Sequence, residues 1–459
     1  MKTNRLFYIT IGMLLIFCSC SKENDFLDQK PDQSLVLPSS LSDYETLLNS
    51  TTVFNRFVDP AMGSASADEY YLPEGTFNSF STSSYRNLYT WQKDIYVGES
   101  TMDGEWNKPY LQVYYCNIIL EGIQTLAIPA SEKETFNRIK GSALFFRAWA
   151  FYNLVQTFAA PYNKESATTD PGIPIKLSSD INARPPRSTV AETYKQIITD
   201  LEIALELLPV INRFKTQPSV IATLGFLSRI HLAMRNYEEA MNYSNKFLVK
   251  FSMLSDFNQF ASNRTLSLHT TFLDEDVFHT TISTSSPSSR SNARIDPVFY
   301  KSYNEKDLRR TLFFRSSGGE ILYKGSYDQY GYPYSGIATD EIMLNRAECY
   351  ARDGKLELAF KDLNSLLIKR WAVGTFVPLS AATRDQALRL ILSERKKELL
   401  FRGTRWNDLR RLNQEDEFKT TLSRTISGQT YTLPPNDPRY IFLIPLSEVQ
   451  QTNISQNLR

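Results

Sequence analysis

The sequence predicts a mainly α-helical protein in which a scaffold of helix pairs is interrupted by long, aromatic-rich loops and short strands. Apolar residues recur at helical spacing over several long segments, and only 18 glycines are present in 459 residues. The chain also contains 25 Tyr and 28 Phe. Hydrophobic residues make up 42% of the chain and charged residues 22%, which is typical of a globular protein with a substantial core.

Residues 1–19 have the pattern of a bacterial lipoprotein signal peptide. Lys2 and Arg5 precede the apolar run 6–17, which is too short to span a membrane. This run leads to a serine directly before Cys20, and a small residue before a cysteine resembles a lipobox. Cys20 is therefore predicted to be the lipid attachment site and the first residue of the mature protein.

Two alternatives to this interpretation stay open. Cys18 is a rival acceptor, although bulky Phe17 precedes it, and a plain cleaved secretory signal would use neither cysteine. After the lipid site, residues 20–30 are polar and acidic at their start and are predicted to form a tether. Residues 31–459 are predicted to form one domain.

Two long segments are predicted to be helices of the core. Residues 132–158 are apolar nearly all round, which indicates burial on several sides. Ser131 and Glu134 are spaced as a capping box at the start of this helix. Residues 188–208 have a single apolar stripe, and Ser188 is predicted to open that helix.

Two later segments, 220–249 and 341–368, are predicted to be helix–turn–helix units. Each has an apolar first helix, a short polar turn and an alanine, Ala240 or Ala359, in the second helix. This pattern resembles tetratricopeptide repeats, in which a small residue lets neighbouring helices pack closely. The two units are far apart in the chain, so the repeats are predicted to be embedded among insertions.

The insertions are about residues 55–110 and 252–336. Both are rich in Ser, Thr, Asn, Gly and Tyr and have weak helical periodicity, so long loops with short strands are predicted. A further short strand is predicted at 440–444. Loops of this length in a compact domain are usually functional.

The sequence contains no recognisable catalytic motif. Nucleotide-binding loops, the zinc-protease motif and the nucleophile elbow are all missing from it. His231 is predicted to be a packed core side chain. His269 and His279 flank the acidic triplet 274–276, where a solvated loop is favoured over a metal site because the spacing fits no ligand pattern. No catalytic residue, metal or cofactor is predicted, although a tertiary pair of carboxylates is not visible in a sequence.

Cysteines and charges complete the residue-level predictions. Cys116 and Cys349 lie in apolar helical patterns, where a free buried thiol is the default, while an export compartment would also permit a disulfide between them. Arginines and acidic residues alternate at helical spacing in 392–412, which favours an ion-pair network across Gly403. An anion site on Arg405 and Arg410 is the alternative. The formal net charge of +1 gives no indication of nucleic-acid binding.

Several short motifs, taken in this order behind a lipobox, resemble the SusD/RagB family of outer-membrane nutrient-binding lipoproteins of Bacteroidetes. The likeness covers nearly the whole chain. Its residues are Cys20 with 25–31 (DFLDQKP), Trp106, Tyr110, Asn117 and Ile118, 147–154 (RAWAFYNL), 187–190 with Asp200, Leu201 and 208–209, 346–350 (RAECY), 394–399 with Gly403, Arg405, Asp408 and Leu409, and Ile444, Pro445, Glu448, Gln456 and Asn457. Arg402 departs from the family, in which an acidic residue commonly precedes the glycine.

The resemblance implies a SusD-like fold on a tetratricopeptide-like scaffold. It also implies a surface-exposed lipoprotein of the outer membrane that acts as the lid of a SusC-like TonB-dependent transporter. The acidic residues after Cys20 resemble the export signal that sends such lipoproteins to the cell surface. Family members bind glycans, or sometimes peptides, without cleaving them.

Aromatic residues of the loops are the candidate ligand-binding residues, because sugar CH faces stack on aromatic rings. The candidates are Tyr70, Tyr71, Phe77, Tyr85, Trp91, Tyr323, Tyr327, Tyr330, Tyr332 and Tyr334. A lipid-anchored hydrolase of surface glycans is the alternative function, with a carboxylate pair in a cleft as its mark. A helical-repeat scaffold for protein interactions is a third possibility, which would present a bare concave groove.

Overall fold

The computed structural model describes residues 38–97, 102–260, 272–283, 287–325, 327–328 and 331–459. The predicted signal peptide, Cys20 and the tether lie outside these residues. Within them helices predominate and the strands are few and short, which confirms the mainly α-helical prediction. No helix in the described part of the chain combines the length and apolar character needed to cross a membrane.

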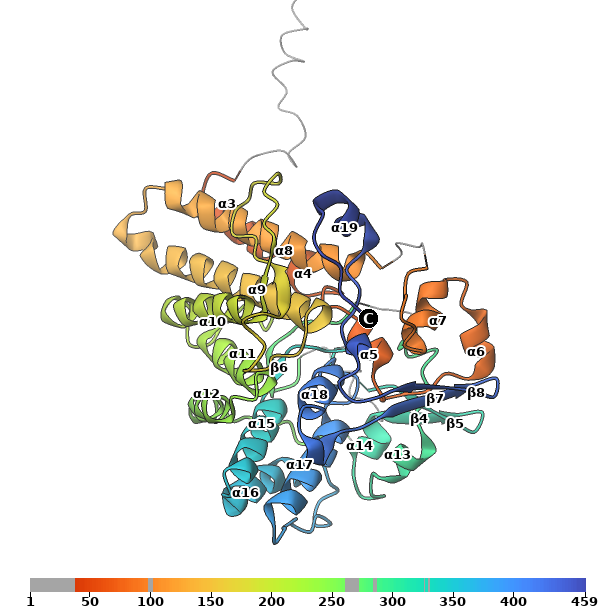
Figure 1. The fold of residues 1–459 in the computed structure, drawn as a ribbon. Coiled ribbons are helices and arrows are strands. Elements are labelled where there is room, and N and C mark those ends of the chain that lie inside the picture. Colours follow the sequence, from red (N-terminus) through yellow and green to blue (C-terminus); the bar gives the residue numbers. More distant parts are fainter. Residues whose placement is uncertain (1–37, 98–101, 261–271, 284–286, 326, 329–330) are drawn as a thin grey trace, which may run out of the picture.

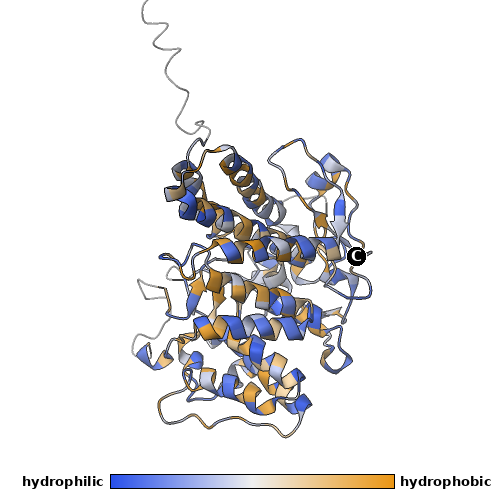
Figure 2. Cartoon of the chain, turned by 90° about the vertical axis from the view of Figure 1, so that its left-hand side faces the viewer, coloured by the Kyte–Doolittle hydropathy of each residue, from blue (hydrophilic) through white to orange (hydrophobic). Residues whose placement is uncertain are grey.

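The scaffold is a stack of helices that runs from α8 and α9 at the top of Figure 1 to α16 at the bottom. Helices α8 to α12 each pack against the next one in the chain, and α12 then packs against α15, which contacts α16 and α17. Hydrophobic and hydrophilic residues alternate along these helices (Figure 2), as expected where one face meets the core. Their bounds are α8 Gly104–Gly122, α9 Lys133–Phe158, α10 Val190–Leu207, α11 Val220–Ala233, α12 Tyr237–Lys250, α15 Thr339–Arg352, α16 Leu356–Leu367, α17 Arg384–Glu398 and α18 Arg405–Leu412.

Helix α9 lies at the centre of the main core, as its apolar pattern predicts. Trp149 is buried and lies 4.6 Å from the ring of Phe226 on α11, centroid to centroid. The predicted capping box of Ser131 and Glu134 is wrong. A 3-10 turn over Ala130–Glu132 leads into the helix, so Ser131 is already helical and Glu132 occupies the cap without a side-chain bond.

The N-cap residue of helix α10 lies one residue later than predicted, and it forms a capping box. Ser188 belongs to strand β2, and Thr189 is the N-cap residue. The hydroxyl of Thr189 accepts a hydrogen bond from the backbone N–H of Glu192, whose carboxylate accepts from the backbone N–H of Thr189. Each of the two side chains therefore binds a backbone N–H group that has no partner within the helix.

Both predicted helix–turn–helix units are present, as α11–α12 and α15–α16. Ala240 and Ala359 are fully buried, in agreement with close helix packing at these positions. His231 is buried and stacks on Tyr243, as predicted for a core side chain. Cys116 and Cys349 are both buried and free, so the disulfide that the compartment would permit is not formed.

The first insertion differs from its prediction, because short helices occupy much of it. These are α5 Met62–Ser66, α6 Glu74–Ser79 and α7 Ser83–Tyr89, which follow α3 Leu41–Leu48 and α4 Thr51–Phe54. Helices this short are held by tertiary packing and have too few turns to give a periodic sequence signal. In the second insertion, loops and short strands are found as predicted, together with α13 Pro297–Lys301 and α14 Arg309–Leu312.

The strands of the described residues form two-stranded antiparallel sheets. The pairs are β1 Pro171–Pro174 with β2 Arg187–Thr189, β3 Asp276–Phe278 with β6 Ile337–Ala338, β4 Phe314–Ser317 with β5 Glu320–Tyr323, and β7 Leu422–Ile426 with β8 Gln429–Leu433. The strand predicted at 440–444 is wrong. The backbone N–H of Phe442 donates to the carbonyl of Thr157, and the backbone N–H of Ile444 donates to the side chain of Gln456, so the segment pairs with no strand. Helix α19 Leu446–Thr452 follows.

The arginine-rich segment 392–412 forms the predicted ion-pair network across Gly403. Arg395 on α17 donates to Asp408 on α18 over 2.8 Å, and Arg411 binds Glu348 of α15 over 2.6 Å. These contacts fix the two helices to the scaffold. Arg405 is engaged by Asp68, with 2.6 Å between Nε and the carboxylate, and so does not form the alternative anion site with Arg410.

The surroundings of His279 differ from the solvated loop that the sequence favours. The side chain is buried, with Nδ1 at 2.6 Å from the carboxylate of Asp276 and Nε2 at 3.4 Å from that of Asp328. Burial disfavours the charged ring, but the two carboxylates outweigh it and raise the pKa of His279 to about 9. His269 lies outside the described residues.

Candidate functional site

A pocket of about 420 Å³ lies beside a second cluster of buried aromatic residues, which includes Tyr323 and Phe401. Five parts of the chain meet there: helix α5, the serine-rich segment after β3, the β4–β5 hairpin, the segment before β6 and the turn between α17 and α18. Its lining residues are Ser64, Ile282, Ser283, Ser288, Ser289, Arg290, Ser291, Arg315, Tyr323, Gly331, Tyr332, Pro333 and Phe401.

Three aromatic rings supply the flat surfaces of this pocket. Tyr323 packs on Phe401, with ring centroids 4.8 Å apart, and Tyr332 packs edge-on against Phe57 at 4.0 Å. Phe401 has a left-handed backbone, with φ of 57°, at the turn between α17 and α18. Its backbone N–H donates to the buried carboxyl of Glu69 over 2.7 Å, which holds the turn in this conformation.

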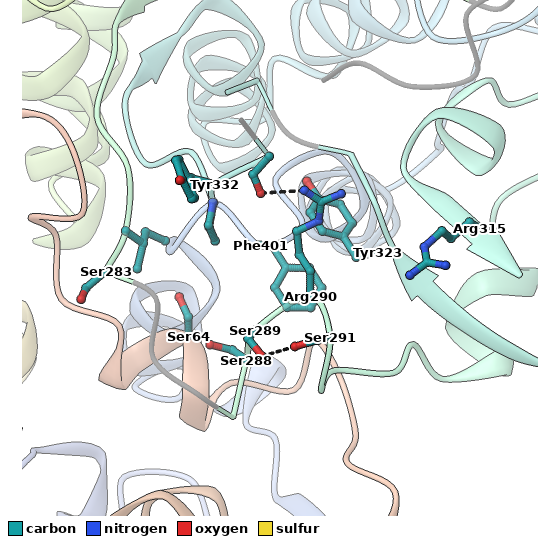
Figure 3. A pocket seen from close by; sticks show the side chains of 13 residues that line it. Ser64, Ser283, Ser288, Ser289, Arg290, Ser291, Arg315, Tyr323, Tyr332 and Phe401 are labelled. Carbon is teal, nitrogen blue, oxygen red and sulfur yellow. Dashed lines mark hydrogen bonds between the residues drawn. The ribbon is translucent and has the colours of Figure 1, made fainter. Parts of the chain in front are cut away.

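Polar groups surround the rings. Figure 3 shows Arg290 in the centre, with Ser288, Ser289 and Ser291 near its backbone and Tyr323 close to its side chain. The guanidinium of Arg290 donates to the carbonyls of Gly331 and Lys324 over 2.9 and 2.8 Å, so it ties the serine-rich segment to the segment before β6. Arg315 on β4 is exposed at the edge of the pocket.

This arrangement can bind a ligand that has both apolar faces and many hydroxyl groups. Rings accept the apolar faces, while serine hydroxyls both donate and accept hydrogen bonds and the guanidinium of Arg315 donates them. Among the described residues that line the pocket, none has a carboxylate side chain. The pair of carboxyl groups that glycoside hydrolysis requires is therefore not part of this lining.

Of the ten aromatic candidates, the structure brings Tyr323 and Tyr332 into this pocket. A second pocket of about 400 Å³, between the segment after α5, helix α17 and strand β7, includes Tyr70, Tyr71 and Trp91 in its lining. Tyr71 is exposed, whereas the other two are buried. The hydroxyl of Tyr70 donates to Ala65 over 2.6 Å, and the indole N–H of Trp91 donates to Ser66 over 3.0 Å.

The remaining candidates that the structure describes line neither pocket. Phe77 is buried against Tyr89, and Tyr85 is half-buried beside Phe80. Tyr327 and Tyr334 are buried, and their hydroxyl groups donate to the carboxylates of Glu275 and Asp276, respectively. Tyr330 lies outside the described residues.

A cluster of three buried carboxylates lies outside the lining of the pocket. Glu275, Asp340 and Glu398 each place an oxygen within 4.8 Å of the others, a spacing that could hold a metal ion. Arg370 binds both Glu275 and Glu398, and Arg402 binds Asp340 over 2.5 Å, so each of the three carboxylates is already paired with a guanidinium group. The cluster is therefore an ion-pair network of the core.

Tyrosine hydroxyls complete this network. Tyr327 lies 2.5 Å from a carboxylate oxygen of Glu275 and 2.8 Å from one of Asp340. Burial raises the pKa of Glu275 to about 7, against the attraction of Arg370. Arg402 lies over the rings of Tyr327 and Tyr334, which explains how a cation is accommodated at this position of the sequence.

Sequence reasoning missed most of the polar residues of the pocket. Arg290 and its neighbouring serines lie in the run 283–291 (STSSPSSRS), whose serine density is a signal that could have found them. Phe401 gives no such signal, because its role depends on a left-handed turn and on a partner, Tyr323, far away in the chain.

Comparisons with known proteins agree with this fold. Residues 25–232 match a family described as "Starch-binding associating with outer membrane", and residues 296–456 match the SusD family, SusD_RagB. The "SusD-like protein P2" of Formosa agariphila is 23% identical over 375 residues, which cover 68% of this chain and 72% of that protein.

Solved structures are similar over nearly the whole chain. A SusD superfamily protein from Bacteroides thetaiotaomicron has a TM-score of 0.73 at 23% identity and covers 92% of this chain and 100% of its own. A protein described as a putative sugar binding protein from Bacteroides vulgatus has a TM-score of 0.71 at 22% identity, covering 92% and 99%. A surface glycan-binding protein A from Bacteroides fluxus has a TM-score of 0.65 at 17% identity, covering 92% and 99%. The two family matches and these shared folds show that the chain belongs to the SusD/RagB family.

Proposed function

We propose that this protein binds a glycan in the pocket between the serine-rich segment and the β4–β5 hairpin, without cleaving it. The observation that carries the proposal is the meeting of Tyr323, Tyr332 and Phe401 with serine hydroxyls and two guanidinium groups in one pocket. Rings stack on sugar CH faces, and the polar groups pair with sugar hydroxyls. Two of the similar proteins are described as a putative sugar binding protein and a surface glycan-binding protein, and these descriptions support this ligand class.

The absence of hydrolysis is part of the proposal. A glycosidase needs two carboxyl groups on either side of the scissile bond. The described lining of the pocket offers none, and the buried carboxylates Glu275 and Asp340 are engaged by Arg370 and Arg402. The glycan is therefore expected to leave the pocket intact.

We also propose that a lipid on Cys20 anchors the protein at the surface of the outer membrane, and that it delivers its ligand to a SusC-like TonB-dependent transporter. The lipobox-like sequence and the family description, which names the outer membrane, support the location. A binding protein without a channel of its own needs a transporter to import what it binds. Recovery of a TonB-dependent barrel with the protein from solubilised outer membranes is expected, and repeated pull-downs without one would refute the lid model.

The binding site is tested with a glycan array followed by two single variants. Arg315→Ala and Tyr332→Ala each remove a group at the pocket edge and should weaken binding of the best glycan about five- to tenfold, since one stacking contact or charged hydrogen bond contributes about 1 kcal/mol. The matched controls are Arg384→Ala and Tyr114→Ala, which change exposed residues outside the pocket lining. The proposal fails if the array shows no bound glycan, or if the pocket variants bind as tightly as the controls.

A further inference from the structure

A third cavity, which shares no lining residue with the glycan pocket, lies where the end of α18 meets two other segments. Its volume is about 250 Å³. The loop after α9 and the segment between β8 and α19 form the other walls, and Pro161, Pro438 and Ile441 give them an apolar character. The full lining is Ala160, Pro161, Arg410, Asn413, Asn436, Asp437, Pro438, Tyr440 and Ile441.

Three side chains of this lining each have a buried polar atom that lacks a well-formed hydrogen bond. They are Nε of Arg410, Nδ2 of Asn413 and the hydroxyl of Tyr440. Within the described part of the chain Nε of Arg410 has no partner, whereas the Asn413 side chain still interacts with the Tyr440 hydroxyl. The three residues are only 1–3% exposed. Buried polar groups are nearly always paired, and leaving one unpaired costs about 1–3 kcal/mol. All three groups can donate a proton, and the Tyr440 oxygen can accept one from Asn413, which leaves Arg410 Nε and the Tyr440 O–H as donors to be satisfied.

Arg410 also lacks a counter-charge. Its other nitrogens donate to the backbone carbonyls of Gln156 and Ala159, which have no net charge. No carboxylate among the described residues forms an ion pair with it, whereas its neighbour Arg411 binds Glu348. Burial accordingly lowers the pKa of Arg410 to about 10. A buried guanidinium is usually paired with an anion, and that anion is missing here.

The other charged groups near the cavity do not supply it. Asp437 belongs to the lining, but both of its carboxylate oxygens accept hydrogen bonds from Arg439, at 2.8 and 2.9 Å. Arg405, whose charge also acts on Tyr440, is paired with Asp68. Asp437 and Arg405 are therefore each held in an ion pair. Arg410 forms no ion pair among the described residues, so its positive charge is not balanced.

We propose that this cavity binds the carboxylate of a small acid, with Arg410 and Tyr440 as its donors. A bound water is the simpler occupant, but a water accepts about two hydrogen bonds and has no charge, whereas a carboxylate has about four acceptor sites and is anionic. The acid is either a free organic acid or a sugar acid. The apolar walls suit the body of either molecule.

The test is calorimetric titration of the purified protein with galacturonate and with benzoate, and with galactose as the neutral counterpart of the sugar acid. At least one acid should bind while galactose does not bind at this site, and the acid that binds identifies its source. Tyr440→Phe should weaken that binding about tenfold, because hydrogen bonds to charged groups contribute about 1.5–3 kcal/mol. Arg315→Ala, in the glycan pocket, should leave it unchanged.

Asn413→Asp is the second variant, for the case that Tyr440→Phe does not fold. It retains the oxygen that accepts the backbone N–H of Thr420 over 3.0 Å, but replaces a donor with an anion. Binding of the acid should be lost. The proposal is overturned if neither acid binds at millimolar concentration, or if the folded variants bind the acid as tightly as the unchanged protein.

Discussion

Glu69 illustrates how a single buried carboxyl group can support the wall of the glycan pocket. One of its oxygens accepts the backbone N–H of Phe401, and the other has no hydrogen-bond partner among the described residues. Burial raises the pKa of Glu69 to about 7, and the nearby Asp68 acts in the same direction. The folded protein therefore retains a proton on this group that the unfolded chain loses near pH 4.5.

This difference predicts a pH dependence of stability. The contribution of Glu69 is fully present below about pH 4.5 and is lost as the pH rises through about 7, by an amount of about 3 kcal/mol. Glu69→Gln keeps the acceptor for Phe401 but does not titrate, so its free energy of unfolding should fall less over this interval than that of the unchanged protein. Urea unfolding between pH 4.5 and 8 measures the difference.

The control is Glu134→Gln, which changes an exposed residue of α9. It should leave the pH profile as it is in the unchanged protein. A Glu69→Gln profile that is parallel to that of the unchanged protein would show that Glu69 is not the group that titrates.

The turn between α17 and α18 positions Phe401 and Gly403 against the pocket, and it depends on glycine. Gly403 has φ of 73°, and a Cβ there would lie 2.9 Å from a methyl carbon of Ile282, which lines the pocket. Gly374 has φ of 74° but open space around it. Comparing the two separates backbone strain from crowding.

Gly374→Ala should cost about 1–2 kcal/mol, the usual penalty of a left-handed alanine. Gly403→Ala should cost about 1 kcal/mol more, because Ile282 must also move. Urea midpoints of both variants give these values. Equal losses would mean that contact with Ile282 does not constrain the turn.

The segment between β5 and β6 is tied to α15 through Tyr327. Its hydroxyl lies between Glu275 and Asp340, and it has one proton for two carboxyl groups. Tyr327→Phe leaves both without this donor and should destabilise the protein by about 1–3 kcal/mol. Tyr431→Phe is the matched control, since its hydroxyl bonds to Gln429 at the surface. Equal unfolding midpoints for the two variants would contradict the structural role of Tyr327.

The whole molecule is expected to depend on its lipid anchor for location. Cys20→Ala should move the protein from the membrane fraction to the soluble fraction, because the proposed lipid attachment site is then lost. Mass spectrometry of the unchanged protein should find the lipid on Cys20. Membrane partition that survives the change, with no lipid on Cys20, would show that the anchor is misassigned.

Much of the helical scaffold could be predicted from the sequence, because α9, α10 and the two helix pairs are long enough to show a period of 3.6 residues. Helices α5 to α7 have at most two turns, and their residues gave no such signal. The site was harder to predict. Among the loop tyrosines, Tyr332 lines the pocket and Tyr327 does not, because the hydroxyl of Tyr327 is hydrogen-bonded to the buried carboxylates of Glu275 and Asp340. Such partners are set by the tertiary fold.

The central claim is that the pocket around Arg290 holds the glycan. A crystal structure of the protein with the best glycan from the array tests it most directly. We expect a sugar ring against Tyr332 or Tyr323, with its hydroxyl groups within hydrogen-bond distance of Arg315 or the serine-rich segment. Glycan density at another place, such as the second pocket beside Tyr71, with the Arg290 pocket empty, would contradict the claim.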